Sequence, residues 1–232
     1  MLPFRDYNSS RSFPLLTLSL IALNTLVYFH MQSLALQGDH VLAHFEHRMT
    51  MVPAGVLGYA TVNSLQPAWL TIFTSMFLHA GFLHLAGNML FLWIFGNNVE
   101  DIMGKMRYLV FYLLCGVIAA AAQIAANPHS VIPVLGASGA ISGVLGAYLV
   151  RFPRAQVDTC IFIFIYFTVV RLPAIVVLGL WFLMQLLMGA TSLLGNPNQG
   201  GVAFWAHIGG FVAGMILVNL FAFPARERYN NR

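Results

Sequence analysis

The sequence predicts an all-α membrane protein, a bundle of six transmembrane helices with a large first external loop and a short central fourth helix. Three observations lead to this prediction. Hydrophobic residues make up 59% of the 232 residues and charged residues only 8%, whereas soluble domains carry about a quarter charged residues. The apolar residues form runs long enough to cross a hydrocarbon core of about 30 Å. The basic residues gather at one set of helix ends, as the positive-inside rule requires.

We expect residues 1–232 to form a single transmembrane domain. Apolar runs place its six spans at residues 13–31, 82–98, 105–126, 138–150, 173–193 and 202–223. The apolar stretch from 67 to 99 would be about 50 Å long as one helix. It is therefore expected to break near Gly81, with its earlier part in or near the membrane interface.

Another apolar run lies between Asp158 and Arg171. As a helix it would cover about 18 Å, too little to cross the membrane. As a lone strand it would leave backbone polar groups unpaired in lipid. We therefore expect a loop that packs against the protein.

The charges orient the bundle. A cytoplasmic N-terminus and six spans put ten of the eleven Lys and Arg residues on the inner side, and only Arg48 outside. This predicts a multi-pass protein with N- and C-termini in the cytoplasm, in a membrane such as the bacterial inner (plasma) membrane. The basic residues form no dense patch, so nucleic acid is not an expected partner. Glu100 and Arg107 are expected to form an ion pair on the inner face.

A polar layer is predicted inside the outer leaflet. Ser138 lies about 20 Å above the inner end of the fourth helix, and His84, Asn88 and His207 lie about 18–25 Å above the inner ends of theirs. His84 and Asn88 are four residues apart and share a helix face. The loop before Ser138 must dip into the membrane, which is tolerated where it lines a water-filled cavity. Ionisable side chains at such depth are functional candidates.

Small residues suggest how two members of this layer could meet. Gly139, Gly143 and Gly146 follow Ser138, and Ala206, Gly210 and Gly214 flank His207. Such small-xxx-small faces let helix backbones approach closely, as a serine–histidine hydrogen bond of about 2.6–3.2 Å requires. His207 could then act as general base. The first amides of the fourth helix, with His84 and Asn88, could hold an oxyanion.

Three motifs in this order resemble the rhomboid intramembrane serine proteases: HLAGNMLFLWIFGNNVED from His84, GASG from Gly136 and AHIGGFVAG from Ala206. The resemblance implies catalysis by Ser138 as nucleophile and His207 as general base. It also implies an oxyanion hole of His84, Asn88 and the Ser138 backbone amide, with no cofactor and no metal. Membrane-spanning protein substrates would be cut near their outer ends, within the lipid bilayer. The resemblance further implies lateral entry past the fifth helix and a capping loop at about 195–201.

Two positions differ from many members of that family. The first external loop, residues 32–66, lacks the tryptophan of a Trp-Arg pair. Ser142 stands where some members carry a tyrosine under the histidine, so the resemblance does not say what orients His207.

Other interpretations are open for single features. GASG alone is more often helix packing than a nucleophile, and a non-catalytic member that binds membrane clients would have the same fold. A small transporter or channel would show charged residues or broken helices near the midplane in paired repeats, and the sequence suggests neither. His40, His44 and His47 share a helix face; we favour the polar side of an interfacial helix over a metal site.

Overall fold

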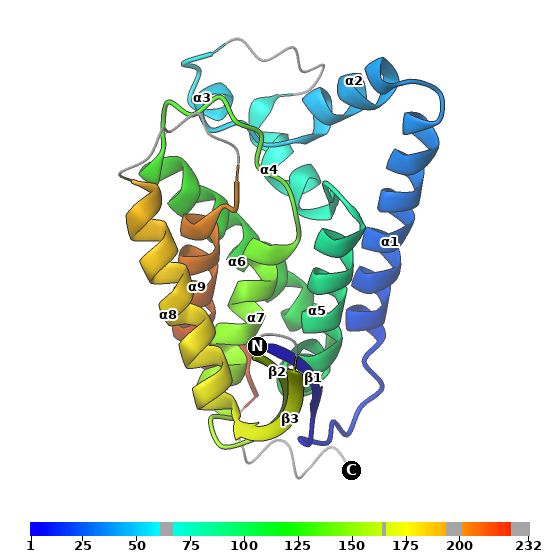
Figure 1. Ribbon diagram of the computed structural model, residues 1–232. Helices are drawn as coiled ribbons and strands as arrows, with labels where there is room; N and C mark the ends of the chain where they lie inside the picture. The colour runs from blue at the N-terminus through cyan, green and yellow to red at the C-terminus, as the bar shows by residue number, and fades with distance from the viewer. Residues whose placement is uncertain (61–66, 164–165, 194–200, 224–232) are drawn as a thin grey trace.

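Long apolar helices make up most of the computed structural model, which describes residues 1–60, 67–163, 166–193 and 201–223 (Figure 1). The long helices are α1 (Leu15–Ala35), α5 (Phe82–Met103), α6 (Lys105–Ala126), α7 (Ser138–Arg151), α8 (Ala174–Ser192) and α9 (Phe204–Phe221). Shorter helices are α2 (Asp39–Met49), α3 (Pro53–Val56), η1 (Ala68–Leu70), α4 (Thr71–Thr74) and η2 (Ser75–Phe77). The strands are β1 (Leu2–Asp6), β2 (Gln156–Ile163) and β3 (Tyr166–Pro173).

The structure is that of an integral membrane protein. Among the described residues, α1, α6, α8 and α9 are each long and apolar enough to cross a membrane. A fifth candidate is α5 taken together with the short helices before it, from which it bends by 80°. The bend confirms the expected break near Gly81. With 14 residues, α7 is only about 21 Å long, so six crossings remain a prediction.

The short helix α7 lies at the centre of the bundle (Figure 1). Nine of its residues, Ala140 to Tyr148, are buried. Large aromatic side chains close the core around it, including the fully buried Phe95, Tyr112 and Phe211. By contrast, α8 and α9 expose side chains such as Leu187 and Ile216 on their outer faces, as helices that face lipid do. The element that carries Ser138 is therefore enclosed by the helices that contact the membrane.

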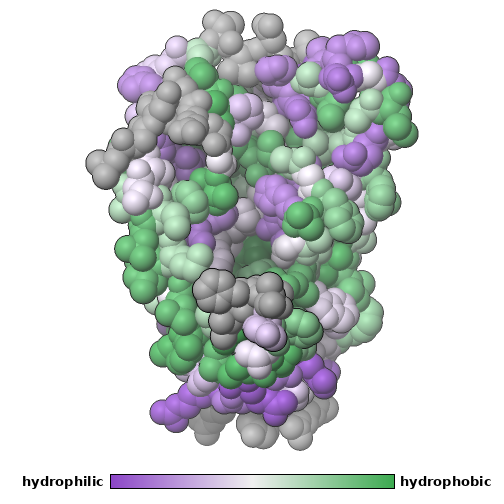
Figure 2. Space-filling model, viewed as in Figure 1, coloured by the Kyte–Doolittle hydropathy of each residue, from purple (hydrophilic) through white to green (hydrophobic). Residues whose placement is uncertain are grey.

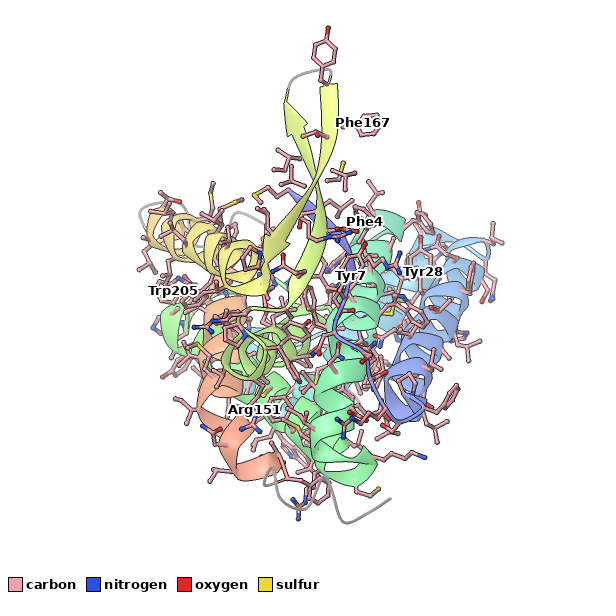
Figure 3. The ribbon with its side chains drawn as sticks, turned by 90° about the horizontal axis from the view of Figure 1, so that it is seen from below. Phe4, Tyr7, Tyr28, Arg151, Phe167 and Trp205 are labelled. Carbon is pink, nitrogen blue, oxygen red and sulfur yellow. The ribbon has the colours of Figure 1, made fainter. Side chains whose placement is uncertain are left out.

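The run between Asp158 and Arg171 is not the expected loop but a β-hairpin. β2 pairs with β3, and β1 from the N-terminus pairs with the other edge of β2, in an antiparallel sheet of order β1-β2-β3. The expectation was wrong because it treated the segment as a lone strand, whereas each neighbour supplies the backbone partners that lipid cannot. Figure 3 shows the hairpin extending outward past the helices, with Phe167 near its tip.

Hydrogen bonds of charged side chains connect the strands of the sheet to one another and to α7. Asp158 and Arg171 are opposite each other in the ladder, and Arg171 Nε donates to Asp158 at 3.0 Å. The Tyr7 hydroxyl donates to the same carboxylate at 2.7 Å and accepts from Arg171 Nη2 at 2.6 Å. Tyr148 from α7 donates to Asp6 of β1 at 2.8 Å. The N-terminal strand is thus tied to both the hairpin and the central helix.

Glu100 does not pair with Arg107, which corrects the expected ion pair. Its buried carboxylate accepts the backbone N–H groups of Leu16 and Thr17 at 3.0 and 2.8 Å, and the Thr17 hydroxyl at 2.8 Å. The guanidinium of Arg107 lies 4.2 Å from the centre of the Phe223 ring. The first amides of a helix need acceptors and carry partial positive charge, so Glu100 serves as a cap for α1.

The first loop contains α2, on which His40, His44 and His47 are all exposed. Within the ranges that the structure describes, no three His, Cys, Asp or Glu side chains lie close enough together to hold a metal ion. The expected capping loop at about 195–201 falls almost wholly outside the described residues.

Candidate active site

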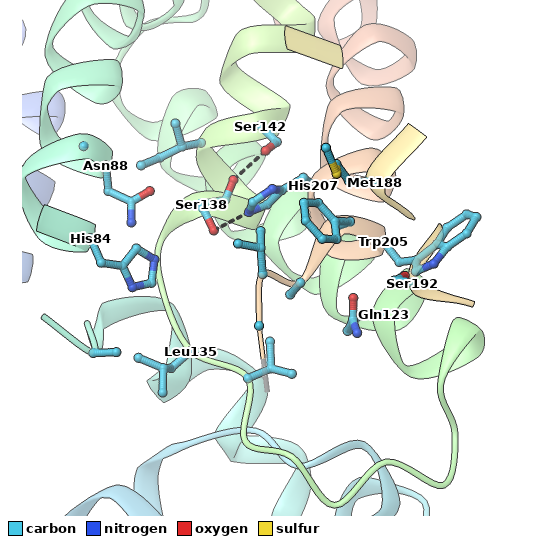
Figure 4. A pocket seen from close by; sticks show the side chains of 18 of the residues that line it. His84, Asn88, Gln123, Leu135, Ser138, Ser142, Met188, Ser192, Trp205 and His207 are labelled. Atoms are coloured by element: carbon cyan, nitrogen blue, oxygen red, sulfur yellow. Dashed lines mark hydrogen bonds between the residues drawn. The ribbon is translucent and has the colours of Figure 1, made fainter. Parts of the chain in front are cut away.

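Ser138 and His207 come together on neighbouring helices. Ser138 is the first residue of α7 and His207 is the fourth of α9. His207 Nε2 lies 2.7 Å from Ser138 Oγ, and Figure 4 shows the ring directed at the hydroxyl. This is the distance at which a histidine can accept a serine proton.

Glycines make this approach possible. A Cβ placed on Gly210 would overlap the backbone oxygen of Gly139, and one on Gly214 would overlap that of Gly143. A Cβ on Gly146 would overlap the backbone oxygen of Phe211. The predicted close packing of these two helices is confirmed. Any larger residue would push α7 and α9 apart and lengthen the distance from Ser138 to His207.

The segment before α7 places Ser138 inside the bundle. From the end of the molecule that carries α2 and α3, the chain descends to begin α7 near the middle (Figure 1). Val134 pairs with Met51 in an isolated bridge, and the Gly136 N–H donates to the Ser75 oxygen at 2.9 Å. Gly136 has a φ of +122°, which favours glycine. A Cβ there would lie only 2.8 Å from ring atoms of His84.

His84 and Asn88 line the opposite wall of the site from α5 (Figure 4). Gly136 lies between this wall and the serine, since a Cβ on it would be 3.7 Å from Ser138 Oγ. Asn88 is buried, and its Nδ2 has no hydrogen-bond partner among the described residues. The backbone amide of Ser138 precedes the first helical bond of α7, from Ile141 N to Ala137 O. These groups are donors that a bound oxyanion could use.

Two residues of α8 that the sequence analysis did not single out contact His207. Gln185 Oε1 lies 2.9 Å from His207 Nδ1, and the Trp181 ring is 5.9 Å from the imidazole at an angle of 33°. Trp181 thus provides a ring against His207, which Ser142 cannot do because serine has no ring. The Ser142 hydroxyl instead donates to the Ser138 backbone oxygen at 2.6 Å. The only signal in the sequence was the spacing of Trp181 and Gln185, four residues apart on one helix face.

The site opens into a cavity of about 840 Å³, large enough for several residues of a bound peptide. Figure 2 shows a recess on this face, between the positions of α8 and α5. Ser138, His84, Asn88 and His207 all line it, together with apolar side chains such as Phe91. Histidines are the only ionisable side chains among its described lining residues.

Comparison with known proteins gives a consistent picture. A family model described as the Rhomboid domain matches residues 66–223. The chain is 44% identical over 92 residues to rhomboid protease GluP of Bacillus subtilis, and 30% identical over 169 residues to rhomboid protein 1, mitochondrial, of Saccharomyces cerevisiae. It is 40% identical over 78 residues to rhomboid-like protein 11, chloroplastic, of Arabidopsis thaliana.

These matches cover 39%, 70% and 34% of this chain and 18%, 44% and 28% of the relatives. The chain therefore spans less than half the length of each of them.

Proposed function

Because the chain belongs to the rhomboid family, we propose that it is an intramembrane serine endopeptidase that cleaves membrane-spanning proteins near the outer membrane face. The observation that carries the proposal is the 2.7 Å approach of His207 Nε2 to Ser138 Oγ inside a cavity of an apolar bundle. Binding alone would need neither this pair nor the Asn88 donor on the opposite wall, which has no partner in the part of the chain that the structure describes.

The proposed reaction uses these atoms as follows. His207 Nε2 takes the proton of Ser138 Oγ as this oxygen attacks the scissile carbonyl carbon. Negative charge then forms on the carbonyl oxygen, where the Ser138 amide, Asn88 Nδ2 and His84 can donate hydrogen bonds. His207 returns the proton to the leaving amine as the peptide C–N bond breaks. A water then releases the acyl group from Ser138 by the same steps, and neither a metal nor a cofactor takes part.

The proposal includes a topology. The six long helices, α7 among them, cross the membrane or lie within it, with both termini and the sheet on the cytoplasmic side of a bacterial-type plasma membrane. Support comes from Arg5, Lys105, Arg151 and Arg171, which lie on strands or at helix ends at the sheet end of the bundle, as the positive-inside rule favours. Substrates would enter from the bilayer past α8 towards the recess in Figure 2.

A serine-directed fluorophosphonate probe tests the proposal on purified protein. Wild type should be labelled and should cleave some members of a panel of single-span proteins, whereas Ser138→Ala and His207→Ala should do neither. Ser19→Ala, at an exposed position of α1, is the control and should match wild type. Labelling that persists in Ser138→Ala would sink the assignment of the nucleophile. Client binding without cleavage or labelling in folded wild type would instead support a non-catalytic rhomboid-like protein.

A further inference from the structure

The second ring nitrogen of His207 has a partner from outside the serine–histidine pair. A neutral imidazole carries one N–H and one lone pair. If Nε2 is to accept the Ser138 proton, the ring proton must reside on Nδ1, and a buried N–H there needs an acceptor. Gln185 Oε1 lies 2.9 Å from Nδ1.

We propose that Gln185 is a positioning residue: its side-chain oxygen accepts the Nδ1–H of His207 and holds the imidazole in the tautomer whose Nε2 can take the Ser138 proton. The inference rests on the proposed function and extends it from a pair to three side chains. Serine hydrolases with a carboxylate in this position use it to fix the same tautomer. Here a neutral amide does so.

The surroundings of His207 favour this role. Gln185 is only 8% exposed, so water competes little for the Nδ1–H group. The titratable side chain near the ring is His84 on α5. Ser138 on α7 presents a hydroxyl, α8 presents Gln185 and Trp181, and the described lining contains no carboxylate. An uncharged acceptor fixes the tautomer without stabilising the imidazolium strongly, which keeps His207 available as a base.

Packing holds both partners in place. Trp181 is one turn before Gln185 on α8, and its ring packs against both His207 and Phe211, at 5.9 and 5.8 Å. On the other side, the backbone N–H of Ala206 donates to Gln123 Oε1 of α6 at 3.2 Å, which fixes the first turn of α9. Ring orientation is therefore set by a hydrogen bond at its edge and an indole at its face. It follows that the correct tautomer requires α8 to be seated against α9.

The opposite orientation of the Gln185 amide would leave Ser138 without a base. If the amide were rotated to present its NH₂ group to Nδ1, the ring proton would move to Nε2 and Ser138 Oγ could only accept a hydrogen bond. The serine would then not be activated. A glutamate at 185 separates the two cases, because its carboxylate can accept but cannot donate.

The test compares Gln185→Leu, Gln185→Glu and Met184→Leu, the last an exposed neighbour on α8, in the full chain. Removal of the acceptor should lower kcat about 10–100-fold with KM little changed, and Met184→Leu should match wild type. Gln185→Glu should regain most of the lost rate. On the acid side, the pH–rate profile of Gln185→Glu should shift to higher pH. The reason is that the carboxylate stabilises the imidazolium, whereas activity needs neutral His207. Nitrogen NMR of the ring in Ser138→Ala should show a protonated Nδ1.

Two results would overturn the inference: a wild-type kcat in folded Gln185→Leu, or a Gln185→Glu variant as slow as Gln185→Leu with Nδ1 unprotonated in the NMR spectrum. Failure of the proposed function would look different. Wild type itself would then show neither labelling nor cleavage, while the NMR spectrum would still report which nitrogen carries the proton.

Discussion

At the residue scale, the chemistry depends on which atom holds each proton. Ser138 and His207 lie at 2.7 Å, but this distance would be the same for either tautomer of the ring. In the proposed arrangement Gln185 decides between them. On the opposite wall, Asn88 supplies a donor that has no partner within the described ranges. Outside the membrane-spanning helices, the Asp158 carboxylate accepts hydrogen bonds from Tyr7 and Arg171 and so links the strands of the sheet.

Acid should weaken the sheet through Asp158. The Tyr7 hydroxyl, and next the Arg171 guanidinium, donate to this carboxylate and hold its pKa below the usual range. A lowered pKa gives stability that is present above the unfolded-state pKa of about 3.9 and is lost as the pH falls through the folded value. The melting temperature of Asp158→Asn should therefore be lower than that of wild type at pH 7, and this difference should disappear below about pH 4.

Thermal unfolding across this pH range measures the difference in melting temperature between Asp158→Asn and wild type. Tyr7→Phe, which removes the hydroxyl that donates to Asp158, should reproduce part of this difference. A difference of constant size from neutral to acidic pH would mean that the ionised form of Asp158 is not what stabilises the sheet.

At the element scale, the contact between α7 and α9 sets the site. Backbone meets backbone at Gly210 and Gly214, so the helices cannot shift without losing the approach of Ser138 to His207. The acceptor for His207 comes from a third helix, α8. The loop before α7 is held by backbone bonds of Val134 and Gly136 to the segments between α2 and α5. The geometry of the candidate site is thus shared among elements far apart in the chain.

Gly214→Ala tests the helix contact away from the reacting atoms. The added methyl group would overlap the Gly143 backbone oxygen, and such overpacking costs about 1–3 kcal/mol or more. We expect a lower melting temperature and slower fluorophosphonate labelling of Ser138. Gly179→Ala on α8 is the matched control, because nothing lies within 4 Å of a Cβ there; it should be neutral or slightly stabilising. Wild-type melting and labelling in Gly214→Ala would contradict the role of this contact.

At the scale of the whole molecule, polar and apolar side chains are arranged as a membrane protein requires. The cavity is lined by the loop before α7, at Val134 and Leu135, and by the first residues of α7 and α9. The sheet, whose strands carry Arg5 and Arg171, lies at the end of the molecule opposite α2 and α3 (Figure 1). Apolar side chains of α8 and α9 cover the surface between these two ends. Under the proposed function, this arrangement would give water a route to the site from one side and let substrates approach within the bilayer.

Cysteine mapping tests the proposed orientation. In a Cys160→Ser background, a membrane-impermeant maleimide should label His44→Cys from outside intact cells, and Arg154→Cys only after permeabilisation. Both positions are exposed, and three proposed crossings separate them. The background protein should stay unlabelled, because Cys115 is buried. Labelling of both positions from the same side would exclude an odd number of crossings between them.

The sequence by itself determined the features that can be recognised within a single segment of the chain. Apolar runs identified the membrane protein and its helical class, glycine spacing foretold the close α7–α9 contact, and three motifs pointed to the family. Only the tertiary structure revealed that Gln185 and Trp181 contact His207. It also revealed that Glu100 caps α1 and that the Tyr7 hydroxyl donates to Asp158 at the sheet. Helix period and hydropathy are local properties of the chain. A hydrogen bond between residues 22 or 151 positions apart depends on how the helices pack, which no local pattern specifies.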